Sequence, residues 1–174
     1  MAWSLQFDGV DDYISIPDAV GSAFEQSFTL VVGIGVLTAP RAFYLAAKGA
    51  IGTGGRYYGF EAKGYTNQLG MRRNTGSNTE YQRYIAGDFA FVDRPIYLTI
   101  TYSRSTGEMR GYRNTEYLGS QTTSTGSIAY KYPLGWNIGA LRRTTVSSIY
   151  SKGQIFCWSL WTEVLTIAEI DAVI

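Results

Sequence analysis

The fold is decided by the stretch Pro95-Ile-Tyr-Leu-Thr-Ile-Thr-Tyr-Ser-Arg-Ser-Thr-Gly-Glu-Met-Arg-Gly-Tyr112. Apolar and polar side chains alternate from Ile96 to Tyr102, which is the pattern of a half-buried β-strand. Residues 103–107 have the Ser and Gly content of a turn, and residues 108–112 are the predicted return strand. The stretch therefore predicts an antiparallel β-hairpin.

Shorter strand patterns continue on both sides of this hairpin. They cover residues 3–7, 13–16, 28–36, 42–47, 57–62, 68–72, 81–85, 136–140 and 153–161. The first two are predicted to pair as a hairpin across the turn at 8–12, whereas the Ser/Thr/Gly tract at 120–127 is predicted to be a loop. Gly33 and Gly35 interrupt an apolar strand, which indicates a bulge or a close contact.

Regularly spaced strands of this kind predict an all-β, two-sheet antiparallel jelly-roll sandwich. One segment, residues 166–174, has a helical pattern instead. Thr166 and Glu169 stand three positions apart there, as in a helix-capping box. We therefore expect the sandwich to end in a short C-terminal helix.

The composition predicts a single domain over residues 1–174. The chain is 45% hydrophobic and 15% aromatic, which suits a packed core. Its 15 Lys and Arg nearly balance 14 Asp and Glu, so no basic face indicates a nucleic-acid partner. No apolar stretch approaches the roughly 18 residues of a membrane span. The N-terminus lacks a signal-peptide pattern, so we expect a protein made in the cytoplasm and not attached to membranes.

The residues that usually carry catalysis are missing from the sequence. The chain has no His, which excludes Ser-His and Cys-His mechanisms. Its one cysteine, Cys157, stands in an apolar run and is predicted to be a buried, inert thiol. A retaining glycosidase needs two carboxyl groups about 5–5.5 Å apart, but the sole Glu-x-Asp pattern, Glu169-Ile-Asp171, lies in the predicted helix. We expect no enzymatic activity.

Five landmarks follow one another along nearly the whole chain. They are residues 5–17 with a Phe-Asp-Gly turn, residues 27–30, residues 45–49 ending in Lys-Gly, the hairpin at 97–112, and residues 153–161 followed by 165–170. Together they resemble laminin-G-like domains of the concanavalin A-like lectin and glucanase jelly-roll family. Gly33-Ile34 stands where the family usually has a Trp. The resemblance implies a jelly-roll sandwich that binds or assembles.

Three acids in the first turn leave two interpretations open. Asp8, Asp11 and Asp12 are residues that a tight turn uses to bond its own backbone. Calcium prefers six to eight oxygen ligands, and closely spaced carboxylates supply them. The cluster therefore predicts either a structured turn or a calcium site.

Tyrosines and arginines are the candidate contact residues, because both are enriched at protein interfaces and Tyr rings also stack on sugars. The candidates are Tyr57, Tyr58, Arg72, Arg73, Tyr81, Tyr84, Tyr130, Tyr132, Arg142 and Arg143. With no catalytic set, we expect a non-catalytic structural subunit on a viral (phage) particle, such as a capsid decoration (cement) or tail protein. Its partners would be other subunits of the assembly or further copies of itself, and it would lie on the virion surface. The alternative is a lectin-like carbohydrate-binding module whose partner is a glycan.

Overall fold

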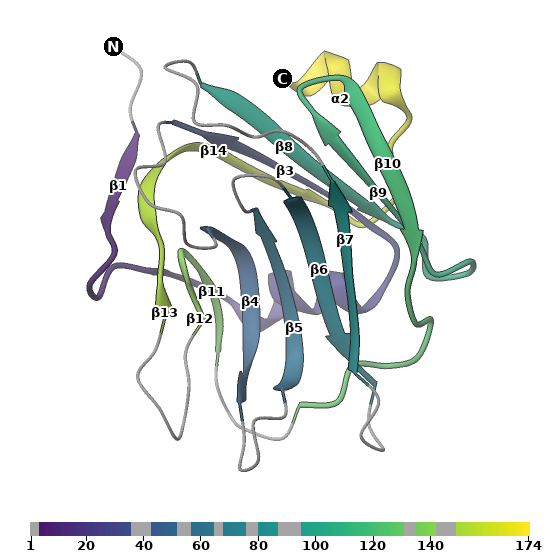
Figure 1. Ribbon diagram of the computed structural model, residues 1–174, viewed down its shortest axis with the longest axis horizontal. Coiled ribbons are helices and arrows are strands. Elements are labelled where there is room, and N and C mark those ends of the chain that lie inside the picture. The colour runs from purple at the N-terminus through teal and green to yellow at the C-terminus, as the bar shows by residue number, and fades with distance from the viewer. Residues whose placement is uncertain are drawn as a thin grey trace.

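Two antiparallel β-sheets packed face to face make up the structure (Figure 1). The computed structural model describes residues 4–35, 43–51, 57–64, 68–75, 80–86, 95–130, 135–141 and 149–174. Each sheet contains six strands within these ranges. The predicted all-β, two-sheet jelly-roll sandwich is confirmed.

The first sheet contains, in spatial order, β1 (Leu5–Asp8), β14 (Lys152–Trp161), β3 (Phe28–Ile34), β8 (Ile96–Tyr102), β9 (Glu108–Arg113) and β10 (Glu116–Thr122). The second contains β2 (Ile14–Ile16), β11 (Trp136–Ile138), β4 (Phe43–Ile51), β5 (Tyr57–Gly64), β6 (Gln68–Asn74) and β7 (Glu80–Ala86). A small pair is formed by β12 (Ala140–Leu141) and β13 (Ile149–Tyr150). The helical segments are α1 (Asp18–Gly21), η1 (Ser22–Glu25) and α2 (Ile167–Val173).

The predicted central hairpin is present as β8 and β9, which pair from Leu98 with Arg113 to Tyr102 with Met109. Along β8 the side chains of Leu98 and Ile100 enter the core, since successive residues of a strand point to opposite faces. The alternation therefore identified the side chains that enter the core, but the strand is not half-buried, because Thr99 and Thr101 on the other face are buried as well.

An aromatic cluster closes one end of the core. The Phe24 ring of η1 stacks on Phe60 of β5 and on Trp136 of β11, with both pairs of ring centroids 4.9 Å apart. Phe60 and Trp136 are 5.6 Å apart, and all three side chains are buried. The cluster thus ties the short helical segment to two strands of the second sheet.

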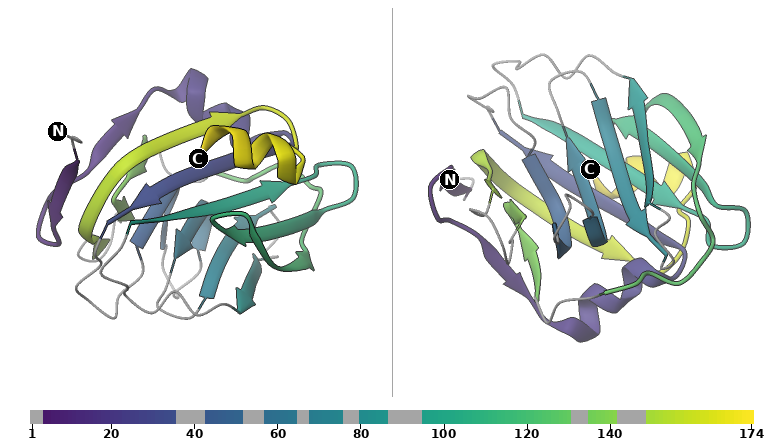
Figure 2. Two further views of the ribbon diagram at one scale, coloured as in Figure 1. Left: turned by 90° about the horizontal axis from the view of Figure 1, so that it is seen from above. Right: turned by 60° about the horizontal axis from the view of Figure 1, so that its bottom comes forward.

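The C-terminal helix α2 lies against the outer face of the first sheet (Figure 2). Its Ile170 is buried with Leu165 and with Tyr112 of β9. Thr166 accepts from the Glu169 backbone amide, and the Glu169 carboxylate accepts from the Thr166 amide at 2.7 Å. The predicted capping box is therefore confirmed. No helix in the described ranges is long and apolar enough to span a membrane.

The predicted hairpin between the first two strands is wrong. Leu5 of β1 pairs with Ile155 of β14 in the first sheet, whereas Ile16 of β2 pairs with Trp136 of β11 in the second. The turn over residues 8–12 therefore carries the chain from one sheet to the other. A short strand, a turn and a second short strand have the same local pattern in both arrangements, so the sequence did not distinguish them.

Three further expectations need correction or refinement. The tract at 120–127 is not all loop, because β10 extends to Thr122. Cys157 is half-buried, not fully buried. The expected close contact at Gly33 is present, since a Cβ there would lie 2.5 Å from the Phe156 ring, and β14 bulges opposite it between Ile155 and Cys157.

Candidate functional site

The outer face of the second sheet carries a group of polar side chains on three neighbouring strands. Core residues of the same strands, Phe60, Ala62, Leu69, Met71 and Ile85, point into the space between the sheets. Because side chains alternate along a strand, the polar residues point away from that core. We call Glu61, Lys63, Arg72, Gln82 and Tyr84 the polar face.

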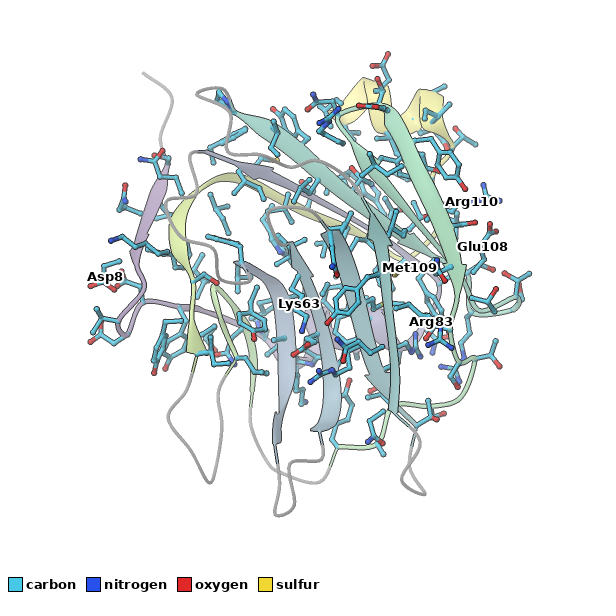
Figure 3. All side chains as sticks on the ribbon, viewed as in Figure 1. Asp8, Lys63, Arg83, Glu108, Met109 and Arg110 are labelled. Carbon is cyan, nitrogen blue, oxygen red and sulfur yellow. The ribbon has the colours of Figure 1, made fainter. Side chains whose placement is uncertain are left out.

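Strand register aligns these residues in two rows across the sheet. In one row Glu61 of β5 pairs with Arg72 of β6, which pairs with Gln82 of β7. In the other, Lys63 pairs with Gly70 and Gly70 with Tyr84. Lys63 lies over the middle of the sheet in Figure 3. Side chains directly opposite each other in such rows are close enough to interact.

The carboxylate of Glu61 connects the charged members of the polar face. Its Oε1 atom accepts a hydrogen bond from Lys63 Nζ and lies 3.5 Å from Arg72 Nε. Arg72 also donates from Nε and Nη2 to Gln82 Oε1, at 3.2 and 2.6 Å. Two cations and one carboxylate leave this group with a formal charge of +1.

The second oxygen of the same carboxylate has no protein partner. Glu61 is 0% exposed, and its Oε2 atom accepts no hydrogen bond. A buried acceptor without a donor costs about 1–3 kcal/mol, more when it is charged. The two cations contact Oε1 and not Oε2, so the hydrogen-bond donor that satisfies Oε2 has to be a water molecule or a group of a ligand.

The contact residues predicted from the sequence do not all lie on one surface. Arg72 and Tyr84 belong to the polar face. Arg73 points the opposite way, into the core, where its guanidinium carbon lies 4.2 Å from the centre of the Tyr102 ring and its Nη2 donates to the Gly126 carbonyl. Burial lowers the pKa of Arg73. Arg73 is therefore part of the internal packing.

Tyr130 also lies at the core, against the Trp136 ring at 6.0 Å between centroids. Three other candidates, Tyr132, Arg142 and Arg143, lie outside the described residues. For Tyr57, Tyr58 and Tyr81 the structure describes only the backbone of β5 and β7. The role of these six residues stays a prediction from the sequence.

Two buried phenols predict a loss of stability at alkaline pH. Burial raises the pKa of Tyr130 and of Tyr102 above the value of about 10 in an unfolded chain. The protonated phenols therefore contribute fully to the free energy of unfolding below pH 10. This contribution is lost as the pH rises further, by up to about 1.4 kcal/mol per pH unit for Tyr130. Urea unfolding at pH 8–11 measures this, and Tyr130→Phe should flatten the decline.

Tyr117→Phe is the control for this experiment, because Tyr117 is 53% exposed. It should leave the decline above pH 10 unchanged. An equal decline in the Tyr130→Phe protein and the wild type would contradict the assignment to Tyr130.

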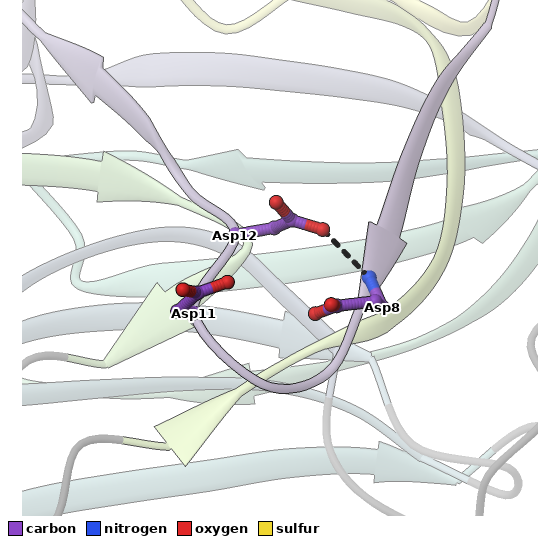
Figure 4. Close-up of side chains that lie close together, drawn as sticks. All are labelled: Asp8, Asp11 and Asp12. Atoms are coloured by element: carbon purple, nitrogen blue, oxygen red, sulfur yellow. Dashed lines mark hydrogen bonds between the residues drawn. The ribbon is translucent and has the colours of Figure 1, made fainter.

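The three acids of the first turn do converge (Figure 4). Carboxylate oxygens of Asp8, Asp11 and Asp12 lie within 4.8 Å of one another. Asp12 Oδ2 accepts from the Asp8 amide at 2.8 Å, and Asp8 Oδ1 accepts from the Val10 amide at 2.7 Å. These bonds are the expected turn chemistry. They account for Asp8 and Asp12, and the calcium site stays a prediction.

Sequence reasoning missed Glu61, Lys63 and Gln82. The available signal was the alternation of polar with core residues along β5, β6 and β7. Polar side chains at every second position of three consecutive strands indicate a shared polar surface on one side of a sheet. A candidate set of Tyr and Arg residues does not contain the carboxylate of Glu61, which contacts both Lys63 and Arg72.

No protein-family model and no curated protein matches this sequence. Solved structures do match. The CBM40 module of a Ruminococcus gnavus intramolecular trans-sialidase, bound to α2,3-sialyllactose, has a TM-score of 0.74 at 13% identity and covers 99% of this chain and 98% of its own. A heptameric SAP-like pentraxin from Limulus polyphemus has a TM-score of 0.62 at 15% identity, and the match covers 98% of this chain and 80% of the pentraxin chain.

A leech intramolecular trans-sialidase also matches, with a TM-score of 0.72 at 10% identity; the match covers 98% of this chain and 27% of that enzyme. At such low identities these likenesses establish the fold alone. The resemblance to laminin-G-like domains of the concanavalin A-like family stays a prediction from the sequence, because no laminin-G domain is among these three structures.

Proposed function

We propose that this protein is a non-catalytic carbohydrate-binding module and that its polar face binds a sugar carrying a carboxylate. The observation that carries the proposal is the buried carboxylate of Glu61, whose Oε2 atom lacks a partner while Lys63 and Arg72 contact Oε1. Two cations beside one carboxylate leave a net positive charge, so the polar face favours a ligand that carries a negative charge.

Sugar chemistry matches each part of the polar face. A sugar reaches the half-buried side chains of Arg72, Gln82 and Tyr84, and the buried Glu61 holds Lys63 and Arg72 in place. Lys63 and Arg72 supply donors for the oxygens of a sugar carboxylate, and Arg binds such groups strongly because the bond is charge-assisted. The ring of Tyr84, which is half-buried, offers a flat apolar surface to the C–H face of a pyranose.

The fold comparison supports the same class of ligand. The R. gnavus module with this fold was solved with α2,3- and with α2,6-sialyllactose, and sialic acid is a sugar with a carboxylate. The polar face itself argues against catalysis, because Glu61 is the one carboxylate among its five residues and retaining hydrolysis uses a pair. Binding without turnover is the function that these features favour.

Titration calorimetry with 3′-sialyllactose and with lactose tests this proposal. The wild type should bind sialyllactose and bind lactose at least about tenfold more weakly, since lactose lacks the carboxylate. Arg72→Gln should weaken sialyllactose binding by about tenfold or more, the effect of losing one charge-assisted bond. No change in thin-layer chromatography of the sugar is expected after long incubation.

Arg110→Gln is the matched control, because Arg110 is exposed on β9 of the other sheet, where it pairs with Glu108 at 2.9 Å. It should bind sialyllactose like the wild type. Equal binding of sialyllactose and lactose, or an Arg72→Gln protein that binds normally, would refute the assignment of the polar face.

The structural-subunit interpretation and the expected cytoplasmic origin stay predictions from the sequence. Neither the described surface nor the comparisons supports assembly on a viral particle or self-association. Light scattering, which measures the oligomeric state, distinguishes the two functions when it is combined with the calorimetry. A monomer that binds sialyllactose fits only the carbohydrate-binding module, and a symmetric oligomer that binds no glycan fits only the structural subunit.

A further inference from the structure

We infer that Gly70 is a positioning residue of the polar face: its missing side chain lets the Tyr84 ring lie flat across β6, beside Lys63. This inference rests on the proposed glycan function, because the feature that Gly70 positions is the surface offered to the sugar. Gly70 has no side chain with which to contact a ligand. Its role is carried out through its neighbours.

The space above Gly70 is filled by the neighbouring ring. A Cβ added to Gly70 would lie 2.3 Å from Tyr84 Cδ1 and 2.5 Å from Cε1. Carbon atoms of separate groups prefer about 3.5–4.0 Å. The ring therefore rests directly on the backbone of β6, and no other residue type at position 70 leaves room for it there.

The register explains why Gly70 controls this contact. Gly70 stands between Lys63 on β5 and Tyr84 on β7 in the same cross-strand row. A side chain in the middle of that row would separate the two outer ones. With Gly there, Lys63 Nζ comes within 5.7 Å of the centre of the Tyr84 ring, which is cation–π range.

The position of the Tyr84 ring also affects the surroundings of the Glu61 carboxylate. Lys63 Nζ also donates to Glu61 Oε1, so the ring of Tyr84, the ammonium of Lys63 and the carboxylate of Glu61 form a connected series. A shift of the Tyr84 ring removes the flat surface and also one of the interactions that hold the ammonium beside Glu61. Gly70 thereby sets the spacing between the apolar and the charged parts of the binding surface.

Gly70→Ala tests this inference with 3′-sialyllactose as the ligand. The variant should bind sialyllactose about three- to tenfold more weakly than the wild type, since the loss of one contact between an aromatic ring and a sugar weakens binding by about that factor. On a Tyr84→Leu background, Gly70→Ala should cause no further loss, because the ring that it displaces is already absent. Additive losses in the two single variants and the double variant would contradict the inference.

Gly33→Ala is the matched control. Gly33 is also a strand glycine under an aromatic ring, with the Phe156 ring 2.5 Å from the position of an added Cβ, but it lies on β3 of the other sheet. Gly33→Ala should lower the melting temperature as Gly70→Ala does and leave the Kd for sialyllactose within about twofold. Equal weakening by both substitutions would show that general destabilisation is the cause.

A proton NMR measurement without ligand completes the test. The Hα resonances of Gly70 should be shifted upfield by the Tyr84 ring and should move to ordinary values in Tyr84→Leu. Unshifted resonances in the wild type would overturn the inference. If the ring shift is present and the wild type binds no sialyllactose, the proposed function fails and Gly70 keeps only its packing role; if the wild type binds and Gly70→Ala binds equally well, the inference alone fails.

Discussion

Replacing Trp136 by Ala should lower the free energy of unfolding by about 3–5 kcal/mol, as expected for a large aromatic side chain removed from a core. Trp136 is 1% exposed and contacts Phe24 at 4.9 Å, Phe60 at 5.6 Å and Tyr130 at 6.0 Å between ring centroids. The cavity would lie where η1 meets β11 and β5, so these elements would lose their shared contact. The total free energy of unfolding of a folded protein is about 5–15 kcal/mol.

Urea denaturation at 25 °C, followed by circular dichroism in the far ultraviolet, measures this loss. Tyr117→Ala is the control, because Tyr117 is an aromatic residue of β10 that lies largely on the surface. It should change the unfolding free energy by no more than about 1 kcal/mol. A loss below about 1 kcal/mol for Trp136→Ala would mean that the aromatic cluster does not anchor the end of the core.

Replacing Glu61 by Ala should cost about 3–5 kcal/mol of stability and abolish measurable binding of sialyllactose. Without the carboxylate, Lys63 and Arg72 face each other as like charges at a largely buried position, since their side chains are 5% and 17% exposed. Removing one partner of a buried charged group is costly because the other charges keep their desolvation penalty. Urea denaturation and calorimetry on the same samples measure the two effects.

The double variant Glu61→Leu/Lys63→Met separates stability from binding. Replacing both members of a buried ion pair by apolar groups is often neutral or stabilising. The double variant should therefore recover most of the stability lost in Glu61→Ala while binding no sialyllactose. If the double variant is as unstable as Glu61→Ala, the pair of Glu61 and Lys63 is needed for folding and does not serve only to bind a ligand.

The parts of the fold that follow from local patterning were predictable. The alternation in β8 indicated its extent and the side chains that enter the core, and the capping box of α2 was visible in Thr166 and Glu169. β10 was missed because, as a polar edge strand, it is mostly exposed or half-buried and shows no apolar alternation. α1 and η1 are single turns, stabilised by the packing of Phe24 and not by a sequence pattern.

Less of the candidate site was predictable, because it depends on register between strands. Arg72 and Arg73 were both named, but neighbouring residues on a strand face opposite sides, so only Arg72 reaches the polar face. Glu61 joins Arg72 and Gln82 only when three strands align in one register. No local pattern determines that alignment.

The pairing of β1 with β14 has a kinetic consequence. Residues 5–8 find their partners at residues 152–155, so β1 is synthesised long before the strand that it pairs with. Contacts between such distant segments slow folding, because the closure entropy must be overcome before the contact forms. During synthesis on the ribosome, the backbone edge of β1 would stay unpaired until β14 has emerged.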